Sequence, residues 1–172
     1  MITDLLRYIF WFILMLLLQV VFLNNVQLGG LVNPFLYIAF IMVLPVRIPG
    51  VVLLLIAFML GLIIDMFSNT MGMHAAACVF MAYARPAVLK LIAPRDGYDA
   101  ESAPSIREQG IYWFVVYVAI MTLLHHLLLF YIEVFRLTEF FSTLARVLLS
   151  SVATTAVILI TQFLIEKPSS GK

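Results

Sequence analysis

The sequence predicts an all-α protein, a polytopic membrane bundle of about six transmembrane helices. Of its 172 residues, 65% are hydrophobic and 11% are charged, and the mean hydropathy is +1.13. A soluble domain is about half apolar and about a quarter charged. A chain of this composition could not cover a water-facing surface with polar groups. We therefore expect lipid to be the solvent for most of it.

Six apolar stretches, separated by short breaks, predict the individual helices. They cover about residues 8–23, 31–44, 50–64, 72–93, 111–132 and 140–165. The stretches 31–44 and 50–64 are shorter than the roughly 20 helical residues that a bilayer needs. Residues 45–49 between them can only turn the chain, which favours a helical hairpin, with a single re-entrant loop as the alternative. One bundle uses nearly every residue, so 1–172 is expected to be a single transmembrane domain.

The first apolar stretch follows Arg7 and resembles a signal peptide in outline. The residues after it, 24–27 (NNVQ), lack the small side chains of a cleavage site. The stretch is therefore expected to be a retained first span.

Basic residues beside the apolar stretches predict the orientation of the bundle. With the N-terminus in the cytoplasm, seven basic residues lie in inner segments and two at the outer side. The inner ones are Arg7, Arg47, Lys90, Arg95, Arg107, Lys167 and Lys172, and the outer ones are Arg136 and Arg146. Because Lys and Arg are enriched in cytoplasmic loops, both termini are expected in the cytoplasm.

Residues 94–109 form the longest hydrophilic stretch, with charges of both signs and two prolines. This composition predicts a cytoplasmic loop between the fourth and fifth helices. An ordinary solvated linker is the favoured interpretation, and contact with a cytoplasmic partner is the alternative.

Ionisable side chains at the ends of apolar stretches need a partner or a route to the interface. Asp65 ends the third stretch, and Gly61, one turn earlier on the same face, would let a neighbouring backbone approach closely. Arg146 is expected at a similar outer depth, which suggests an ion pair with Asp65. The alternative is that each side chain extends to the interface separately. Three histidines are expected near that depth: His74, His125 and His126.

The histidines do not predict a metal site, because adjacent helical residues point about 100° apart and His125 and His126 cannot share one ligand set. Cys78 is the single cysteine, which excludes an intrachain disulfide. The chain lacks H-E-x-x-H, G-x-S-x-G and glycine-rich phosphate loops. We therefore expect no catalytic residue, no cofactor and no enzyme activity.

Two further features concern the inner half and the packing of the helices. Arg85, beside Pro86, is expected to extend to the inner interface together with Lys90. Small residues gather at the start of the fourth stretch, from Gly72 onward, and along the sixth stretch. Close helix packing is the favoured interpretation, and a polar pathway along the sixth helix is the alternative.

Several strings resemble a known family. Residues 33–37 (NPFLY), 44–45 (LP) and 61–77 (GLIIDMFSNTMGMHAAA) resemble the bacterial rod shape-determining MreD family. Residues 94–96 (PRD), 104–107 (PSIR) and 125–126 (HH) resemble its Bacteroides-type branch. The resemblance covers essentially the whole chain. The candidates for a structural or partner-binding role are Gly61, Asp65, Gly72, His74, Arg146 and Pro45.

The resemblance implies a non-enzymatic scaffold of the cell-elongation machinery in the bacterial inner membrane. Members of the family bind MreC and work with MreB filaments, RodZ, and the RodA and PBP2 synthases. They help to couple MreB filaments to peptidoglycan synthesis and so maintain rod shape. The family is also similar in fold to the S-components of energy-coupling-factor transporters. The resemblance carries over no catalytic residue.

Two other functions remain as alternatives. A transporter S-component would dock its coupling subunit through small residues on the first helix, but 8–23 contains no Gly, Ala or Ser. The third possibility is a lipid-headgroup binder with an outer-leaflet cavity lined by Asp65, His74 and Arg146.

Overall fold

The computed structural model describes residues 2–25, 32–99, 102–135 and 137–165, which fold almost entirely into helices. The predicted all-α class is confirmed for this part of the chain. The α-helices are α1 (Ile2–Leu17), α2 (Ala39–Met42), α3 (Gly50–Ser68), α4 (Met73–Leu91), α5 (Ile106–Gln109), α6 (Ile111–Val134) and α7 (Phe140–Ile165). Shorter helical turns are η1 (Leu18–Phe22), η2 (Leu23–Asn25), η3 (Leu36–Ile38) and η4 (Leu137–Glu139).

Three helices, α3, α6 and α7, are long and apolar enough to cross a membrane. With α4, they lie within a few residues of four of the predicted stretches. Helix α1 and the turn η1 together contain a shorter apolar stretch, Leu6–Phe22. Helix α4 carries His74, Arg85 and Lys90. The structure therefore supports a membrane protein, and six crossings remain a prediction.

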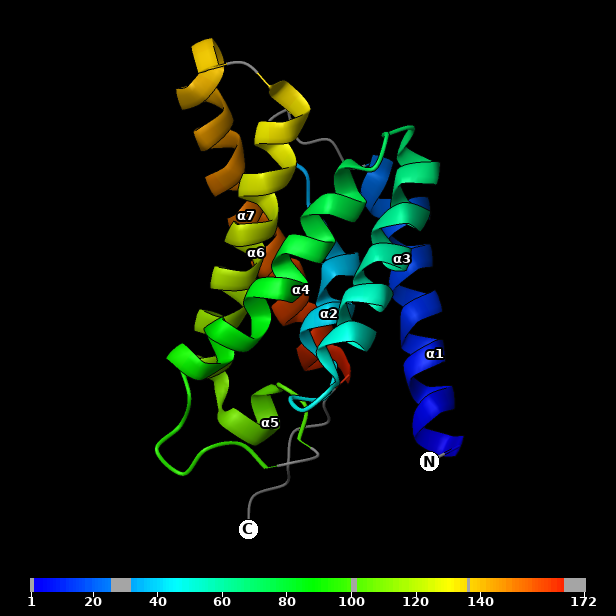
Figure 1. The fold of residues 1–172 in the computed structure, drawn as a ribbon, viewed down its shortest axis with the longest axis vertical. Coiled ribbons are helices and arrows are strands. Elements are labelled where there is room, and N and C mark those ends of the chain that lie inside the picture. The colour runs from blue at the N-terminus through cyan, green and yellow to red at the C-terminus, as the bar shows by residue number, and fades with distance from the viewer. Residues whose placement is uncertain (1, 26–31, 100–101, 136, 166–172) are drawn as a thin grey trace.

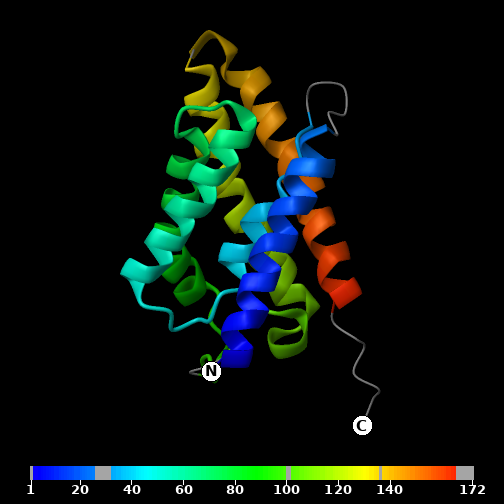
Figure 2. The same ribbon diagram turned by 90° about the vertical axis from the view of Figure 1, so that its right-hand side faces the viewer.

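The long helices form a row in which each packs on the next (Figure 1). Helix α3 contacts α4, α4 contacts α6, and α6 contacts α7. Helix α1 stands beside this row and contacts α2 and η3 (Figure 2). The start of α1 and the end of α7 lie at the same end of the bundle.

The predicted helix over 31–44 differs from the structure. Residues 33–35 have no regular secondary structure, and helical geometry covers only Leu36–Ile38 and Ala39–Met42. The first arm of the expected helical hairpin is therefore only partly helical, whereas α3 forms the second arm. Pro34 contributes to this difference, because proline disfavours helical geometry in the residue before it and donates no backbone hydrogen bond.

The backbone N–H groups of this irregular segment donate hydrogen bonds to side chains of α7. The Asn33 N–H donates to Ser150 Oγ at 3.0 Å, and the Phe35 N–H donates to Thr154 Oγ1 at 3.0 Å. Irregular backbone is tolerated inside a membrane protein only where such partners satisfy it. Two polar side chains of the sixth stretch, Ser150 and Thr154, therefore bond the backbone of another segment.

Gln19 supports the same segment from the other side. Its Oε1 accepts from the Leu36 N–H at 2.7 Å, and its Nε2 donates to the Pro34 carbonyl at 3.2 Å and to Asn24 Oδ1 at 2.9 Å. Gln19 lies in the π-helical turn η1 and is fully buried. A buried amide with bonds at both ends has its desolvation cost offset.

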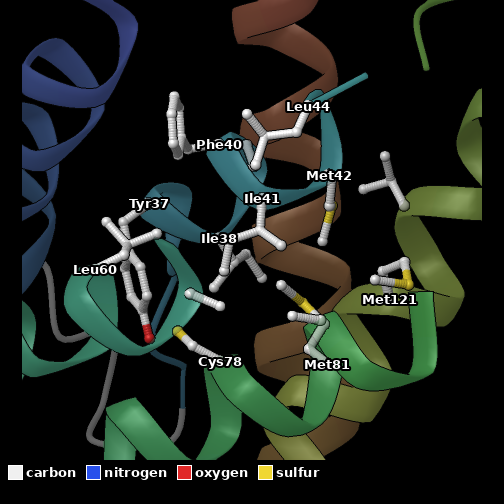
Figure 3. Packing of buried hydrophobic residues seen from close by; sticks show 14 of the residues in the cluster. Tyr37, Ile38, Phe40, Ile41, Met42, Leu44, Leu60, Cys78, Met81 and Met121 are labelled. Carbon is white, nitrogen blue, oxygen red and sulfur yellow. The ribbon is translucent and has the colours of Figure 1, made fainter. Parts of the chain in front are cut away.

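Helix α2 is the centre of the hydrophobic core. The side chains of η3 and α2 are at most 4% exposed. Figure 3 shows Ile38, Ile41 and Met42 directed among side chains of the surrounding helices, including Met81 and Met121. Because α2 is enclosed on all sides, its four residues (AFIM) are all apolar.

The described part of 94–109 is an ordered turn rather than a plain linker. The Val46 N–H donates to the Ser102 carbonyl at 3.0 Å, which attaches the loop to the connection between α2 and α3. Ser105 caps α5, because its Oγ accepts from the Glu108 N–H at 3.2 Å. The loop therefore packs over one end of the bundle.

Candidate functional site

The Asp65 carboxylate caps the first turn of α4. Its Oδ1 accepts from the His74 N–H at 3.0 Å, and its Oδ2 accepts from the Ala75 N–H at 3.0 Å. The Thr70 hydroxyl donates to Oδ1 at 2.5 Å. The N-cap residue of α4 is Gly72, which has no side chain for this purpose. Asp65, only 3% exposed, therefore satisfies from α3 the N–H groups that a helix start leaves free.

Gly61 brings the backbones of α3 and α4 together, as its position predicted. A Cβ atom added to Gly61 would lie 2.5 Å from the Ala75 Cα, 2.6 Å from the Ala75 nitrogen and 2.6 Å from the His74 carbonyl oxygen. All three are backbone atoms, which cannot move aside alone. Gly61 and Asp65, one turn apart, thus contact the same two residues of α4.

The connection between α3 and α4 turns through two left-handed residues. Asn69 has φ 54° and ends α3, with its N–H bonded to the Asp65 carbonyl. Gly72 has φ +80° and begins α4. Asparagine and glycine are the residues that adopt this conformation most easily. Gly72 is therefore required by the turn.

A buried hydrogen-bonded chain joins η3 to α4 and α6 through Tyr37. The Tyr37 hydroxyl lies 2.8 Å from His74 Nδ1 and 3.0 Å from His125 Nε2. A phenol has one hydrogen, so it donates to only one of these rings. His125 Nδ1 is buried with no partner in the described part of the chain. If His125 Nε2 donates to Tyr37 and Tyr37 donates to His74, the unpaired atom is the His125 Nδ1 acceptor. The opposite direction would leave an unpaired N–H on Nδ1, which costs more.

The neighbouring His126 belongs to a second chain. Its Nδ1 lies 2.8 Å from the Thr122 carbonyl, so Nδ1 carries the proton. Its Nε2 then accepts from Thr154 Oγ1 at 3.2 Å, and the same hydroxyl accepts from the Phe35 N–H. Each polar atom in this chain is thus either a donor or an acceptor with a partner. The hydrogen bonds hold the irregular segment before α2 against α6 and α7.

The three histidines surround an aromatic ring. The Phe35 centroid lies 5.4 Å from the ring centroid of His74, 6.1 Å from that of His125 and 5.3 Å from that of His126. Within the described ranges, no group of three or more His, Cys, Asp or Glu side chains is placed to hold a metal ion.

The predicted ion pair between Asp65 and Arg146 is wrong. Arg146 Nη1 lies 3.2 Å from Glu133 Oε1, and its guanidinium lies 4.2 Å from the centre of the Phe130 ring. Asp65 is used at the α3–α4 turn. The reason is lateral order: α4 and α6 stand between α3 and α7, although the two residues were expected at similar depth.

Arg85 also differs from its prediction, because it turns into the bundle instead of towards the interface. It is 1% exposed and donates to the carbonyls of Met42, Leu44 and Pro45, which follow or end α2. Its Nε donates to the Tyr117 hydroxyl at 2.9 Å, and that hydroxyl donates to the Met42 carbonyl at 3.1 Å. Arg85 therefore caps the negative end of α2. Pro45, a candidate from the sequence, contributes through its carbonyl.

Three cavities in the described part of the structure lie away from the predicted outer-leaflet site at Asp65, His74 and Arg146. One of about 590 Å³ lies between α1 and the 94–109 loop. One of about 710 Å³ lies between α3 and α4, and one of about 440 Å³ lies between α6 and α7. None of the three is lined by Asp65, His74 or Arg146. The expected headgroup cavity is therefore not among them.

Comparison with known proteins gave no match to a family model, to a curated protein or to a solved structure. The likeness to the MreD family, and through it to transporter S-components, therefore rests on the sequence strings described above.

Replacing Asp65 with asparagine is expected to lower the free energy of unfolding by about 2 kcal/mol. The amide keeps one acceptor and turns an NH₂ group towards a backbone N–H of α4. Thermal unfolding in detergent measures the change, and Asp96→Asn in the exposed loop is the matched control. Exchange of the charges, Asp65→Arg with Arg146→Asp, is expected to restore nothing. Recovery of the wild-type melting temperature in the exchanged protein would contradict the cap.

Proposed function

We propose that the chain is a non-enzymatic MreD-type scaffold of the inner membrane, which binds MreC. Through MreC it would help to couple MreB filaments, together with RodZ, RodA and PBP2, to peptidoglycan synthesis during cell elongation. The proposal includes six crossings, made by α1, the segment around α2, α3, α4, α6 and α7.

One observation carries the proposal: the polar side chains that mark residues 61–77 are used within the chain. The Asp65 carboxylate accepts from the Thr70 hydroxyl and the His74 N–H, and the His74 ring bonds to Tyr37. A catalytic or transport site would instead turn such groups towards a cavity. This arrangement supports a function that depends on a fixed surface presented to another protein.

The topology is consistent with both termini on the cytoplasmic side. The start of α1 and the end of α7 share one end of the bundle (Figure 2), as an even number of crossings requires. The described basic residues Arg47, Lys90 and Arg95 follow α2 or lie at the end of α4, at this same end. Their position supports a cytoplasmic assignment for it.

Cysteine crosslinking to co-expressed MreC tests the proposal. In a Cys78→Ser background, single cysteines at exposed positions of α1, α3, α4 and α7 would be paired with cysteines in the transmembrane segment of MreC. Useful positions are Ile9, Phe58, Phe80 and Val152. We expect disulfide-linked heterodimers from one face of the bundle, detected by immunoblot.

The control is Ala57→Cys, because Ala57 is fully buried next to the exposed Phe58. It is expected to give no heterodimer. Absence of any crosslink at all exposed positions, together with normal cell shape on depletion of the chain, would overturn the proposal. Binding of a vitamin-sized ligand in the same preparation would then favour the transporter subunit.

A further inference from the structure

The cavity between α1 and the 94–109 loop holds charges of both signs. Arg7 lines it from α1, and Asp99 and Glu108 line it from the loop and α5. Its volume of about 590 Å³ falls in the range of small-molecule sites. The cavity is therefore large enough for a polar group that carries both charges.

The three charged groups do not neutralise one another. No ion pair within 4.0 Å joins Arg7, Asp99 or Glu108 to another side chain in the described part of the molecule. The Arg7 guanidinium lies 5.5 Å from the centre of the Tyr8 ring, which leaves its N–H groups available. Opposite charges that line one cavity without pairing leave room for a ligand between them.

The two walls of the cavity differ in polarity. Helix α1 contributes Trp11 and the buried Met15, and the loop contributes Ser102 and Ser105. The loop wall is fixed in place, because the Ser102 carbonyl accepts from the Val46 N–H. One side of the cavity thus fits apolar chain and the other fits a polar group.

The residues that line the cavity come mainly from α1, α5 and the loop before α5, and α5 lies at the end of the bundle where α1 begins (Figure 1). The outer face of α1 above it exposes Leu6, Phe10 and Ile13, which suits contact with lipid chains. Tryptophan and tyrosine, present here as Trp11 and Tyr8, favour the headgroup level of a membrane. The ligand best matched to this place is the headgroup of a phospholipid.

We propose that this cavity binds a phosphoethanolamine headgroup. The phosphate accepts hydrogen bonds from Arg7, and the ammonium donates to Asp99 and Glu108. The glycerol and the first carbons of the chains contact Trp11 and Met15. An anionic glycerol headgroup offers no cation to the two carboxylates, and a choline headgroup cannot donate hydrogen bonds to them.

Native mass spectrometry of the full chain tests the proposal, after exchange into micelles with equal amounts of phosphatidylethanolamine, phosphatidylcholine and phosphatidylglycerol. Phosphatidylethanolamine is expected to be retained in preference to both others. In the double variant Asp99→Asn/Glu108→Gln, its preference over phosphatidylcholine is expected to fall about tenfold. Arg7→Gln is expected to weaken the binding of phosphatidylethanolamine and phosphatidylcholine equally, because both headgroups carry the phosphate.

The control is Arg95→Gln/Asp96→Asn, which removes one positive and one negative charge in the same loop outside the cavity lining. It is expected to bind like the wild type. An unchanged lipid preference in the carboxylate variant, or preferred retention of phosphatidylglycerol, would overturn the proposal. Binding of soluble phosphoethanolamine without any lipid preference would assign the cavity to a soluble ligand and overturn the lipid assignment. A melting temperature equal to that of the wild type shows that each variant is folded.

Discussion

Replacing Gly61 with alanine is expected to lower the free energy of unfolding by about 3 kcal/mol. The new methyl group would lie 2.5 to 2.6 Å from backbone atoms of His74 and Ala75, so α3 and α4 would have to separate. Separation would also lengthen both hydrogen bonds from Asp65 to the start of α4. One methyl group therefore weakens packing and capping together.

Reversible unfolding in mixed micelles, or the melting temperature of a fluorescent fusion, measures this effect. Gly50→Ala is the matched control, because no atom lies within 4 Å of a Cβ added at Gly50. It is expected to change stability little, or to raise it slightly through the higher helix propensity of alanine. Equal stability of the two variants would mean that α3 and α4 do not approach as closely as described.

Replacing Arg85 with methionine is expected to cost about 3 kcal/mol. Methionine fills a similar volume but donates nothing to the three carbonyls that follow or end α2. The Leu44 carbonyl would then lie in the core without the donor it now has, whereas the Met42 carbonyl would keep Tyr117. The end of α2 is expected to loosen, which hydrogen exchange of its amides would detect.

Lys90→Met is the matched control, since Lys90 is exposed in the last turn of the same helix. It is expected to leave the exchange of α2 unchanged. Arg85→Lys is expected to recover only part of the loss, because one ammonium cannot reach all the acceptors that the guanidinium spans. Full recovery with lysine would indicate that charge alone matters at this position.

The sequence was informative wherever a local pattern determines structure. The bounds of helices α3, α4, α6 and α7 lie close to those of the predicted apolar stretches. Because glycine has no Cβ, Gly61 indicated a close contact between helices before its partner helix was known. Such features depend on length, hydrophobicity and side-chain size, all of which are visible along a single chain.

The errors concern how the helices are ordered side by side. Expected depth placed Asp65 and Arg146 together, but two helices separate them. The hydrophobicity of residues 31–44 predicted a helix. Residues 33–35 are instead irregular, and their N–H groups bond to residues more than 100 positions later in the chain. Arg85 was expected to extend to the interface, because its partners could not be identified along the chain. They are carbonyls of α2 and of the residues after it, a segment predicted to be one longer helix.

The irregular residues before α2 have a consequence for how the protein is made. The partners of the Asn33 and Phe35 amides lie 117 and 119 residues further along the chain, in α7. In the proposed six-span topology, these amides reach the membrane before Ser150 and Thr154 have been synthesised. Unpaired amides in lipid are costly, so the two hydrogen bonds that hold this segment form only once α7 is inserted. Insertion of α7 thereby completes the segment that precedes α2.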